Sequence, residues 1–375
     1  MRYYNALLFL GEQGFVHGGF DVEDGRFADV FTDDREGDVD LGGATVIPGL
    51  VDIHTHGAAG ADFSDGDEDG LRCMAEHLAR RGVTSFAPTS MTLPYETLSK
   101  AFTTAAELYR NRPENGSRIM GIHMEGPYFS EKKKGAQNAA YLHLPDFEGF
   151  RALYEGCGGL VRIVDVAPEL EGAADFTAKA KTLCTVSVAH TDANYEEAKT
   201  VFKAGAGHLT HLYNAMPPIH HRKPGVIGAA SEQEDVIAEL ICDGMHVHAS
   251  SVRMAFKLFP GRICLISDSL RCCGMPDGEY ELGGQRIFLS GGVARLADGT
   301  LAGAASDLYA DMRNAIAFGI PKEEAILAAT IRPAREIGHE AEIGSIEAGK
   351  FADFVVCDEN LTAHTVYVGG KRIGG

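Results

Sequence analysis

Short apolar stretches recur along the chain and alternate with longer segments of amphipathic pattern. The stretches occupy residues 45–52, 83–89, 118–125, 161–167, 185–190, 208–213, 236–242 and 263–268. In the intervals, apolar positions repeat at helical spacing, as in residues 70–81, 95–111, 194–204 and 250–258. Near-continuous apolar strands, each followed by a crossover long enough for a helix, are typical of parallel sheets covered by helices. Eight such runs predict an α/β fold, a (β/α)8 TIM-type barrel, with a doubly wound open sheet as the alternative.

Both ends of the chain have a different pattern, in which short strands follow one another through turns. The apolar runs are residues 6–10, 15–22 and 27–32 at the start and residues 352–357, 365–368 and 371–373 at the end. Two or three short strands bury too little apolar surface to form a stable sheet alone. We therefore expect residues 1–47 and 347–375 to pair into one small β-sandwich domain, and residues 48–346 to form the barrel domain.

Composition and charge limit the kinds of molecule that we expect this protein to bind. Of the 375 residues, 45% are hydrophobic and 23% are charged, so the chain can bury a large core. The formal net charge of −19 repels nucleic-acid phosphates and anionic lipid, so we expect neither a nucleic-acid nor a membrane partner. Residues 6–10 are too short an apolar run for a signal peptide. The eight cysteines include no CxxC pair, which indicates a reduced, cytoplasmic protein.

Titratable side chains lie where the predicted strands end. They are His54 and His56 in the first run, Glu125 in the third, His190 in the fifth, His211 in the sixth and Asp268 in the eighth. In a barrel these strand ends converge on one mouth, where such enzymes place their active sites. Imidazoles and carboxylates around one mouth can bind a divalent metal ion in an open coordination set. His54 and His56 are two residues apart on a strand, so both side chains point to the same face.

The run from Pro48 to His56, Pro-Gly-Leu-Val-Asp-Ile-His-Thr-His, resembles the opening signature of the amidohydrolase superfamily. Within it, the chain is similar to N-acetylglucosamine-6-phosphate deacetylases in further motifs that follow in the family's order as far as about Gly349. They include Gly121-Ile122-His123-Met124-Glu125-Gly126-Pro127, Ala189-His190-Thr191-Asp192, Thr210-His211-Leu212-Tyr213-Asn214-Ala215, Asp243-Gly244-Met245-His246 and Ser267-Asp268-Ser269. The resemblance implies the barrel with a small terminal domain.

The resemblance also implies one or two divalent metal ions per subunit, with zinc, iron, manganese and cobalt as candidates. The residues that match the family's tightly bound metal are Glu125, His190 and His211. Those that match a second ion in some members are His54 and His56, with Glu125 and Asp268 shared. Asp268 matches the family's catalytic aspartate, which accepts a proton from a water acidified by the metal and returns it to the leaving amine.

The implied reaction is hydrolysis of N-acetyl-D-glucosamine 6-phosphate to D-glucosamine 6-phosphate and acetate, a step of amino-sugar catabolism and cell-wall recycling. The residues that match substrate contacts are Ala136, Gln137, Asn214, Ala215, Arg222 and His246. Some relatives carry a histidine where this chain has Gln137. In the family a phosphate contact can come from the neighbouring subunit, which implies a homodimer.

Two other functions are weighed against this one. The first is deacetylation of N-acetyl-D-galactosamine 6-phosphate, or another amidohydrolase activity, which would change only the contacts to the sugar. The second is a catalytically inactive barrel scaffold. Because a scaffold has no use for several uncompensated polar groups at one mouth, the set formed by Glu125, His190, His211 and Asp268 argues against it.

Two further histidines have competing interpretations. His123 shares a strand face with Glu125 and is either a metal ligand or, as we expect, a residue that supports one. His208 is out of phase with His211, so we expect it to be structural.

Overall fold

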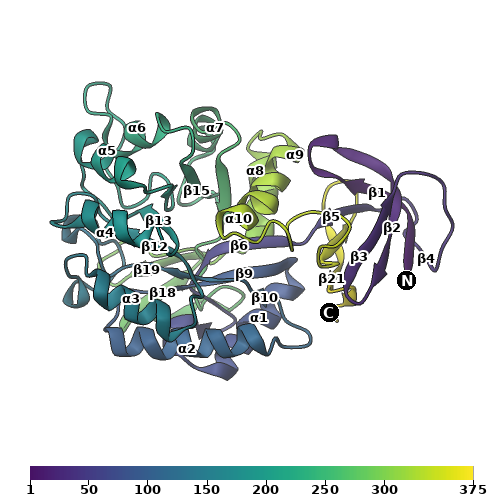
Figure 1. Cartoon of the computed structure of the whole chain (residues 1–375), viewed down its shortest axis with the longest axis horizontal. Helices are drawn as coiled ribbons and strands as arrows, with labels where there is room; N and C mark the ends of the chain where they lie inside the picture. The colour runs from purple at the N-terminus through teal and green to yellow at the C-terminus, as the bar shows by residue number, and fades with distance from the viewer. Residues whose placement is uncertain (375) are drawn as a thin grey trace.

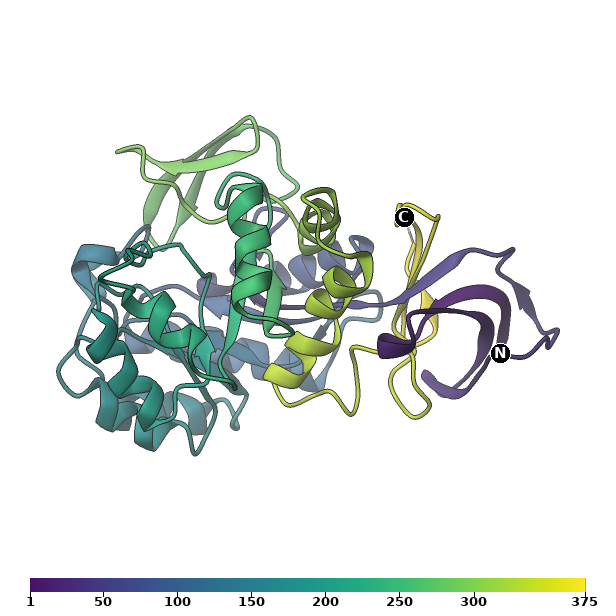
Figure 2. The ribbon, with the colours of Figure 1, turned by 90° about the horizontal axis from the view of Figure 1, so that it is seen from above.

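The computed structural model describes residues 1–374, which form a parallel barrel beside a separate sheet built from both ends of the chain (Figure 1). Both termini lie in this terminal sheet, at the right of the view. Helices surround the barrel, and α8, α9 and α10 lie between its strands and the terminal sheet (Figures 1 and 2). The predicted fold class is therefore confirmed.

The barrel strands pair in parallel around a ring, and the first and last strands of the ring meet at the mouth. They are β6 (Leu50–Thr55), β9 (Val83–Ser90), β11 (Ile122–Met124) with β10 (Arg118–Ile119), β12 (Val161–Val166), β13 (Thr185–Val188), β14 (His208–Leu209), β15 (Ile237–Ile241) and β16 (Ile263–Ile266). The Asp268 N–H donates to the His54 carbonyl oxygen at 2.9 Å, and Thr55 forms a parallel bridge with Ser269. These contacts join the end of β16 to β6 and close the ring.

Helices form at the amphipathic segments predicted from the sequence, residues 70–81, 95–111, 194–204 and 250–258, and at further positions. They are α1 (Glu68–Arg80), α2 (Tyr95–Arg110), α3 (Phe147–Gly156), α4 (Ala173–Ala180), α5 (Tyr195–Ala204), α6 (Gly225–Ser231), α7 (Ala249–Leu258), α8 (Leu308–Ala317), α9 (Lys322–Ala329) and α10 (Ile331–Glu336). Side chains fix their starts: Asp67 accepts the Gly70 N–H ahead of α1, and Asn194 forms a capping box with Glu197 in α5. Within residues 1–374, no helix is both long and apolar enough to span a membrane.

The first apolar run differs from its prediction as one barrel strand. Residues 45–52 divide into β5 (Thr45–Pro48), which pairs in the terminal sheet, and β6, which enters the barrel. Gly49 separates the two strands. A Cβ atom at Gly49 would lie 2.1 Å from Oγ1 of Thr84. Only glycine therefore allows the chain to pass this close to β9.

The terminal sheet interleaves strands from the two chain ends. Its order is β22-β21-β20-β5-β1-β2-β3, with β4 beside β1. The bounds are β1 (Arg2–Phe9), β2 (Phe15–Glu23), β3 (Arg26–Phe31), β4 (Val39–Asp40), β20 (Phe354–Cys357), β21 (Ala363–Val368) and β22 (Lys371–Arg372). Because β20 pairs with β5, the C-terminal strands complete a sheet that the N-terminal strands begin, and aromatic side chains from both ends fill its core.

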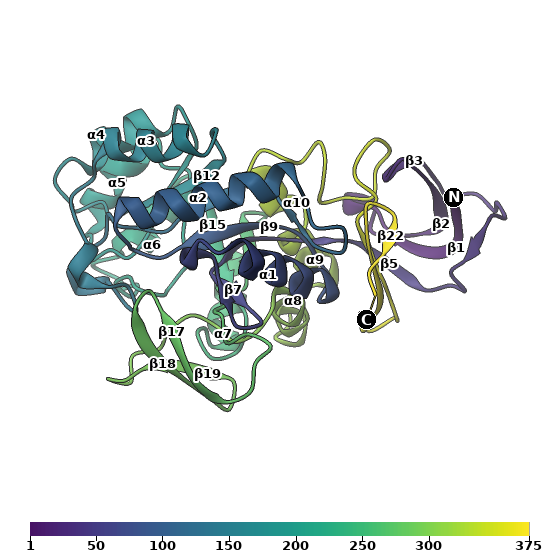
Figure 3. The ribbon, with the colours of Figure 1, turned by 90° about the horizontal axis from the view of Figure 1, so that it is seen from below.

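Small sheets at the mouth were not predicted. The larger comprises β17 (Gly278–Leu282), β18 (Gln285–Ser290) and β19 (Val293–Leu296), and it projects from the barrel (Figures 2 and 3). The smaller pairs β7 (Gly57–Ala58) with β8 (Ala61–Asp62). The Gln285 side-chain amide donates to the Ala136 carbonyl oxygen at 2.6 Å, and Leu282 packs in a cluster with Met91. The projecting sheet thus forms part of the wall of the mouth.

The terminal sheet should depend on its aromatic core. Phe354 is fully buried, with its ring centroid 4.3 Å from that of Tyr367 and 4.8 Å from that of Phe20. We expect Phe354→Ala to lower the free energy of unfolding by about 3–5 kcal/mol, because it leaves a cavity between strands from both chain ends. Phe288→Ala, at an exposed position of β18, is the control and should cost under about 0.5 kcal/mol. Urea denaturation measures both, and equal effects would contradict the assignment of this core.

Candidate active site

A cavity of about 260 Å³ opens at the C-terminal ends of the barrel strands. It is lined by every site residue predicted from the sequence except His54 and Arg222: His56, Glu125, Ala136, Gln137, His190, His211, Asn214, Ala215, His246 and Asp268. His54 is fully buried beside the cavity, whereas Arg222 lies on an exposed loop. The strand ends therefore bring most of the predicted residues to one place.

Glu125, His190 and His211 converge with their ligand atoms within 4.8 Å of one another. Oε1 of Glu125 lies 3.2 Å from Nε2 of His190 and 3.1 Å from Nε2 of His211. Nδ1 of His190 donates to the Lys133 carbonyl oxygen at 2.9 Å, so the neutral ring keeps its lone pair on Nε2. A lone pair facing a carboxylate oxygen is unfavourable unless a cation or a proton lies between them. This donor set therefore fits a divalent metal ion.

His54, His56 and Asp268 form a second group that faces the same glutamate. Nε2 of His56 lies 3.2 Å from Asp268 Oδ1 and 3.4 Å from Glu125 Oε2, while its Nδ1 faces the Thr89 carbonyl oxygen at 3.1 Å. Nε2 of His54 lies 3.6 Å from Glu125 and 3.5 Å from Asp268, and among residues 1–374 it has no hydrogen-bond partner. An unpartnered buried nitrogen between two carboxylates leaves a position that a second cation fits.

The electrostatics of the cavity draw positive charge inward. Burial opposes the ionisation of Glu125, yet the imidazoles of His190 and His211 beside it hold its pKa well below the usual range. Burial likewise would lower the pKa of His211, but the hydrogen bond to Glu125 overcomes it and raises that pKa to about 9. Asp268 and Glu125 raise the pKa of His56 to about 9 against the same opposing effect of burial. These carboxylates attract cations, either as protons or as metal ions.

Three of the site residues have left-handed backbone conformations directly after their strands. The φ angles are 43° at His190, 32° at His211 and 50° at Asp268. Such conformations cost about 1–2 kcal/mol in residues other than glycine, and they persist where the surrounding structure enforces them, commonly at functional sites. The strands β13, β14 and β16 thus end in turns that aim these side chains at the cavity.

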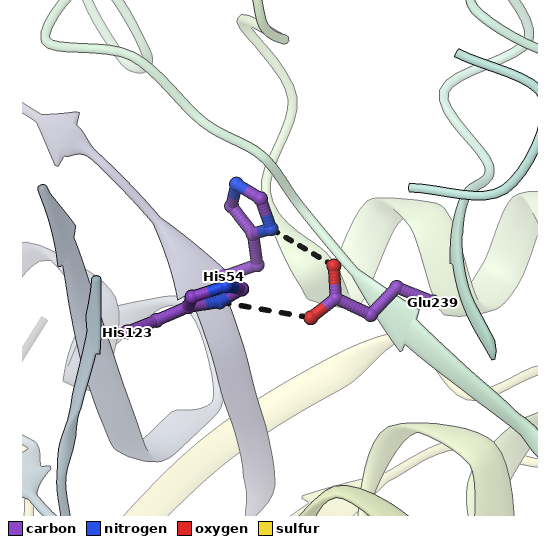
Figure 4. Close-up of side chains that lie close together, drawn as sticks. All are labelled: His54, His123 and Glu239. Atoms are coloured by element: carbon purple, nitrogen blue, oxygen red, sulfur yellow. Dashed lines mark hydrogen bonds and ion pairs between the residues drawn. The ribbon is translucent and has the colours of Figure 1, made fainter. Parts of the chain in front are cut away.

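Glu239 is a charged residue of this region that the sequence analysis missed. It lies on β15 and is fully buried, with a carboxylate oxygen 2.9 Å from Nδ1 of His54 and the other 3.7 Å from Nδ1 of His123 (Figure 4). The ring of His123 is engaged on both sides, by the Ile53 carbonyl oxygen at 3.1 Å and by Asp165 at 2.9 Å. This agrees with a supporting role for His123. A single acidic residue inside the apolar run 236–242 was the available signal for Glu239.

Gln137 and His246 line the cavity with different chemistry. Both ends of the Gln137 amide are engaged, since its nitrogen donates to Glu125 and its oxygen accepts the Thr92 N–H at 2.8 Å. His246 lies 2.7 Å from Asp243 through Nδ1 and 2.9 Å from the Ala302 carbonyl oxygen through Nε2. Both of these partners are acceptors, an arrangement that favours a proton on each ring nitrogen. Although burial lowers the pKa of His246, Asp243 raises it overall, and the ring offers positive charge beside the cavity.

Arg222 is not part of this cavity. Its guanidinium lies 2.7 Å from Nε2 of His221 on the exposed loop before α6. Among the residues that the structure describes, no lysine or arginine lines the cavity. Any phosphate bound here must therefore rely on His246, on neutral donors such as Asn214, and on charge supplied from outside the cavity.

The two ligand groups should lose metal differently. We expect His211→Ala to abolish tight binding of an ion, because it removes one of the three ligands, which are Glu125, His190 and His211. His54→Ala should remove mainly the second ion and leave the first in place. Metal analysis of the purified variants after dialysis measures both occupancies. Complete metal loss in His54→Ala with none in His211→Ala would reverse the assignment.

Residues 45–373 match the model of the amidohydrolase family. The N-acetylglucosamine-6-phosphate deacetylase of Bacillus subtilis (strain 168) is 38% identical over 329 residues, which cover 85% of this chain and 83% of that protein. The N-acetylgalactosamine-6-phosphate deacetylase of Escherichia coli O157:H7 is 36% identical over 326 residues, with 86% of each covered. A solved structure of N-acetyl-D-glucosamine-6-phosphate deacetylase from Mycobacterium smegmatis, in complex with N-acetyl-D-glucosamine-6-phosphate, matches with a TM-score of 0.94 and 32% identity, covering 100% of this chain and 99% of that one. The chain belongs to the amidohydrolase family, in the group that contains the N-acetylglucosamine-6-phosphate deacetylases.

Proposed function

We propose that this chain is a metal-dependent deacetylase that hydrolyses N-acetyl-D-glucosamine 6-phosphate to D-glucosamine 6-phosphate and acetate. The observation that carries the proposal is the convergence of two ligand groups on Glu125, in a cavity that also presents the cationic ring of His246. Relatives that bear this activity match nearly the whole chain. The first group suits the amide end of such a substrate and His246 suits its phosphate.

In this mechanism Glu125, His190 and His211 would hold the first metal ion, and His54 and His56, together with Glu125 and Asp268, would hold a second. Zinc, iron, manganese and cobalt all suit imidazole and carboxylate ligands. When bound, the metal acidifies a water molecule and polarises the acetyl carbonyl group. The chain's own part is to fix these ligands and to move the proton.

Asp268 moves that proton. Burial opposes its ionisation, but the hydrogen bond from His56 lowers the pKa of Asp268 below its ordinary value, so the carboxylate is ready to accept a proton. It takes the proton from the attacking water and then donates it to the nitrogen of the leaving amine. Its place at the cavity wall, beside Glu125 and His56, suits both transfers.

The phosphate is bound by His246, by Asn214 and by the Ala215 amide, with Arg222 contributed by the neighbouring subunit of a homodimer. Two observations support this division: Arg222 is exposed, and no lysine or arginine among residues 1–374 lines the cavity. A guanidinium matches phosphate oxygens through two parallel hydrogen bonds. Ala136 and Gln137 border the acetamide end. We place the enzyme in the cytoplasm.

The galactosamine epimer is a second candidate substrate, because one relative at 36% identity is an N-acetylgalactosamine-6-phosphate deacetylase. Acetate release from both N-acetylhexosamine 6-phosphates, measured with metal analysis of the same sample, decides between them. Faster turnover of the galacto compound would select the alternative. The absence of turnover on either compound, with metal bound, would favour an inactive scaffold.

Asp268→Asn should abolish most turnover. An amide cannot accept and return the proton, and the loss of a general acid–base group typically costs about 100- to 10,000-fold in rate. The ion held by Glu125, His190 and His211 should remain, since Asp268 is not among that group. Steady-state kinetics and metal analysis test both statements. A rate near that of the parent would contradict the role given to Asp268.

Arg222→Ala should weaken binding of the sugar phosphate by about 10- to 150-fold, the usual value of one charge-assisted contact. The effect should appear mainly in KM, and free N-acetylglucosamine should be a poor substrate that the change leaves unaffected. Equal impairment of the free sugar and its phosphate would make Arg222 structural.

A mixture of the two variant subunits tests where Arg222 acts. In heterodimers of Arg222→Ala and Asp268→Asn chains, one site combines an intact Asp268 with Arg222 of the other chain. We therefore expect mixing to restore low-KM activity. No restoration in verified heterodimers would show that Arg222 serves its own chain.

A further inference from the structure

We propose that Glu239 is a positioning residue that fixes His54 and His211 in the orientations that bind metal, and so controls occupancy of the second ion. This inference rests on the proposed function only in that the two ligand groups form the metal centre. Glu239 itself is fully buried and does not line the cavity.

The contacts of Glu239 join both ligand groups. Oε2 lies 2.9 Å from Nδ1 of His54 and also accepts the backbone N–H of His211 at 3.2 Å. Oε1 lies 3.0 Å from Nε2 of His208. One carboxylate on β15 therefore holds a side chain from β6 and the backbone at the turn that follows β14, where His211 has its left-handed conformation.

The contact with His54 determines which of its nitrogens can bind a cation. Because an ionised carboxylate only accepts hydrogen bonds, Nδ1 of His54 must carry the proton and Nε2 must carry the lone pair. Nε2 is the atom that lies unpartnered between Glu125 and Asp268. His190 and His56 are fixed in the same way, but by the carbonyl oxygens of Lys133 and Thr89. A charged acceptor makes His54 the more basic ligand.

His208 makes a buried carboxylate at this position tolerable. Its Nε2 faces Glu239, and its Nδ1 lies 3.1 Å from Oε1 of Glu336 at the end of α10. With a carboxylate on each side, the ring carries two protons and one positive charge. That positive charge lies against Oε1 of Glu239, while His54 contacts Oε2. A buried carboxylate with an oppositely charged group in direct contact avoids the cost of an isolated charge.

The alternative interpretation of this cluster is a third metal site, because His54, His123 and Glu239 have ligand atoms within 4.8 Å of one another (Figure 4). The distances favour direct hydrogen bonding. His54 is already at 2.9 Å from Glu239, and Nδ1 of His123 contacts the Ile53 carbonyl oxygen at 3.1 Å. An ion here would have to displace both interactions, so a third ion is an outcome that would overturn the proposal.

Glu239→Gln is the test, with Glu336→Gln as the matched control. Each change replaces one of the two carboxylates that flank His208, but only the first alters the contact with His54. A glutamine has one acceptor oxygen for three converging N–H groups, so its NH₂ must face at least one of them. We expect the affinity for the second ion to fall by about 10- to 100-fold in Glu239→Gln. The first ion should stay bound, and Glu336→Gln should match the parent.

The measurements use the full chain, stripped with a chelator and reloaded with Co²⁺. Competition titration gives the affinity of each ion, and the visible spectrum of Co²⁺ reports the coordination of the second site independently of activity. A parent spectrum and parent affinities in Glu239→Gln would overturn the proposal, as would equal losses in Glu336→Gln. A parent that binds three ions, one of which is lost in Glu239→Gln, would overturn it in favour of a third site.

Glu239→Asp covers the case in which the glutamine variant does not fold. It keeps the negative charge beside His208 but withdraws the oxygens from His54 by one methylene, so we expect a smaller loss in the same direction. Parent affinity for the second ion in folded Glu239→Asp would overturn the proposal. If the parent binds two ions but releases no acetate from either sugar phosphate, the proposed function fails while this inference stands.

Discussion

The burial of carboxylates among imidazoles at one end of the barrel is the constraint on which the rest of the structure depends. Glu125, Asp268 and Glu239 are each almost completely removed from solvent. Each would cost several kcal/mol if it were unpaired. Histidines at the neighbouring strand ends supply the partners, and they do so without neutralising the site, because their free nitrogens remain directed at the carboxylates. The result is a site that is electrostatically complete only with a cation.

The same constraint explains how an acidic protein can accept an anionic substrate. The net charge of −19 is a property of the whole surface, whereas a ligand in the cavity experiences mainly the groups within a Debye length. Although burial lowers the pKa of His246, Asp243 contacts its ring and raises that pKa overall. This favours a positive charge on His246 at the cavity wall. The cations attracted by Glu125 and Asp268 add positive charge at the other end. Positive charge close to the bound substrate can outweigh the repulsion between the anionic substrate and the net negative charge of the protein.

Sequence reasoning predicted the features that depend on periodicity and on strand ends. The eight parallel runs, helices α1, α2, α5 and α7, and the grouping of His190, His211 and Glu125 follow from rules that act along the chain. The division of the first run at Gly49 does not, because it depends on the approach of Thr84 from β9. Glu239 was missed because its role comes from three strands that meet only in the folded barrel. The exposure of Arg222 is likewise a tertiary property.

Closure of the barrel and assembly of the site are one event rather than two. The hydrogen bond from the Asp268 N–H to the His54 carbonyl oxygen closes the ring of strands, and it also places Asp268 beside His54 and His56. Glu239 adds a second tie, between β15, β6 and the turn after β14. The left-handed conformations of His211 and Asp268 store backbone strain that these two contacts hold in place. A metal ion bound between the carboxylates would therefore stabilise the closed ring as well as the site, because it would bind only the geometry in which the ends of β6 and β16 already meet.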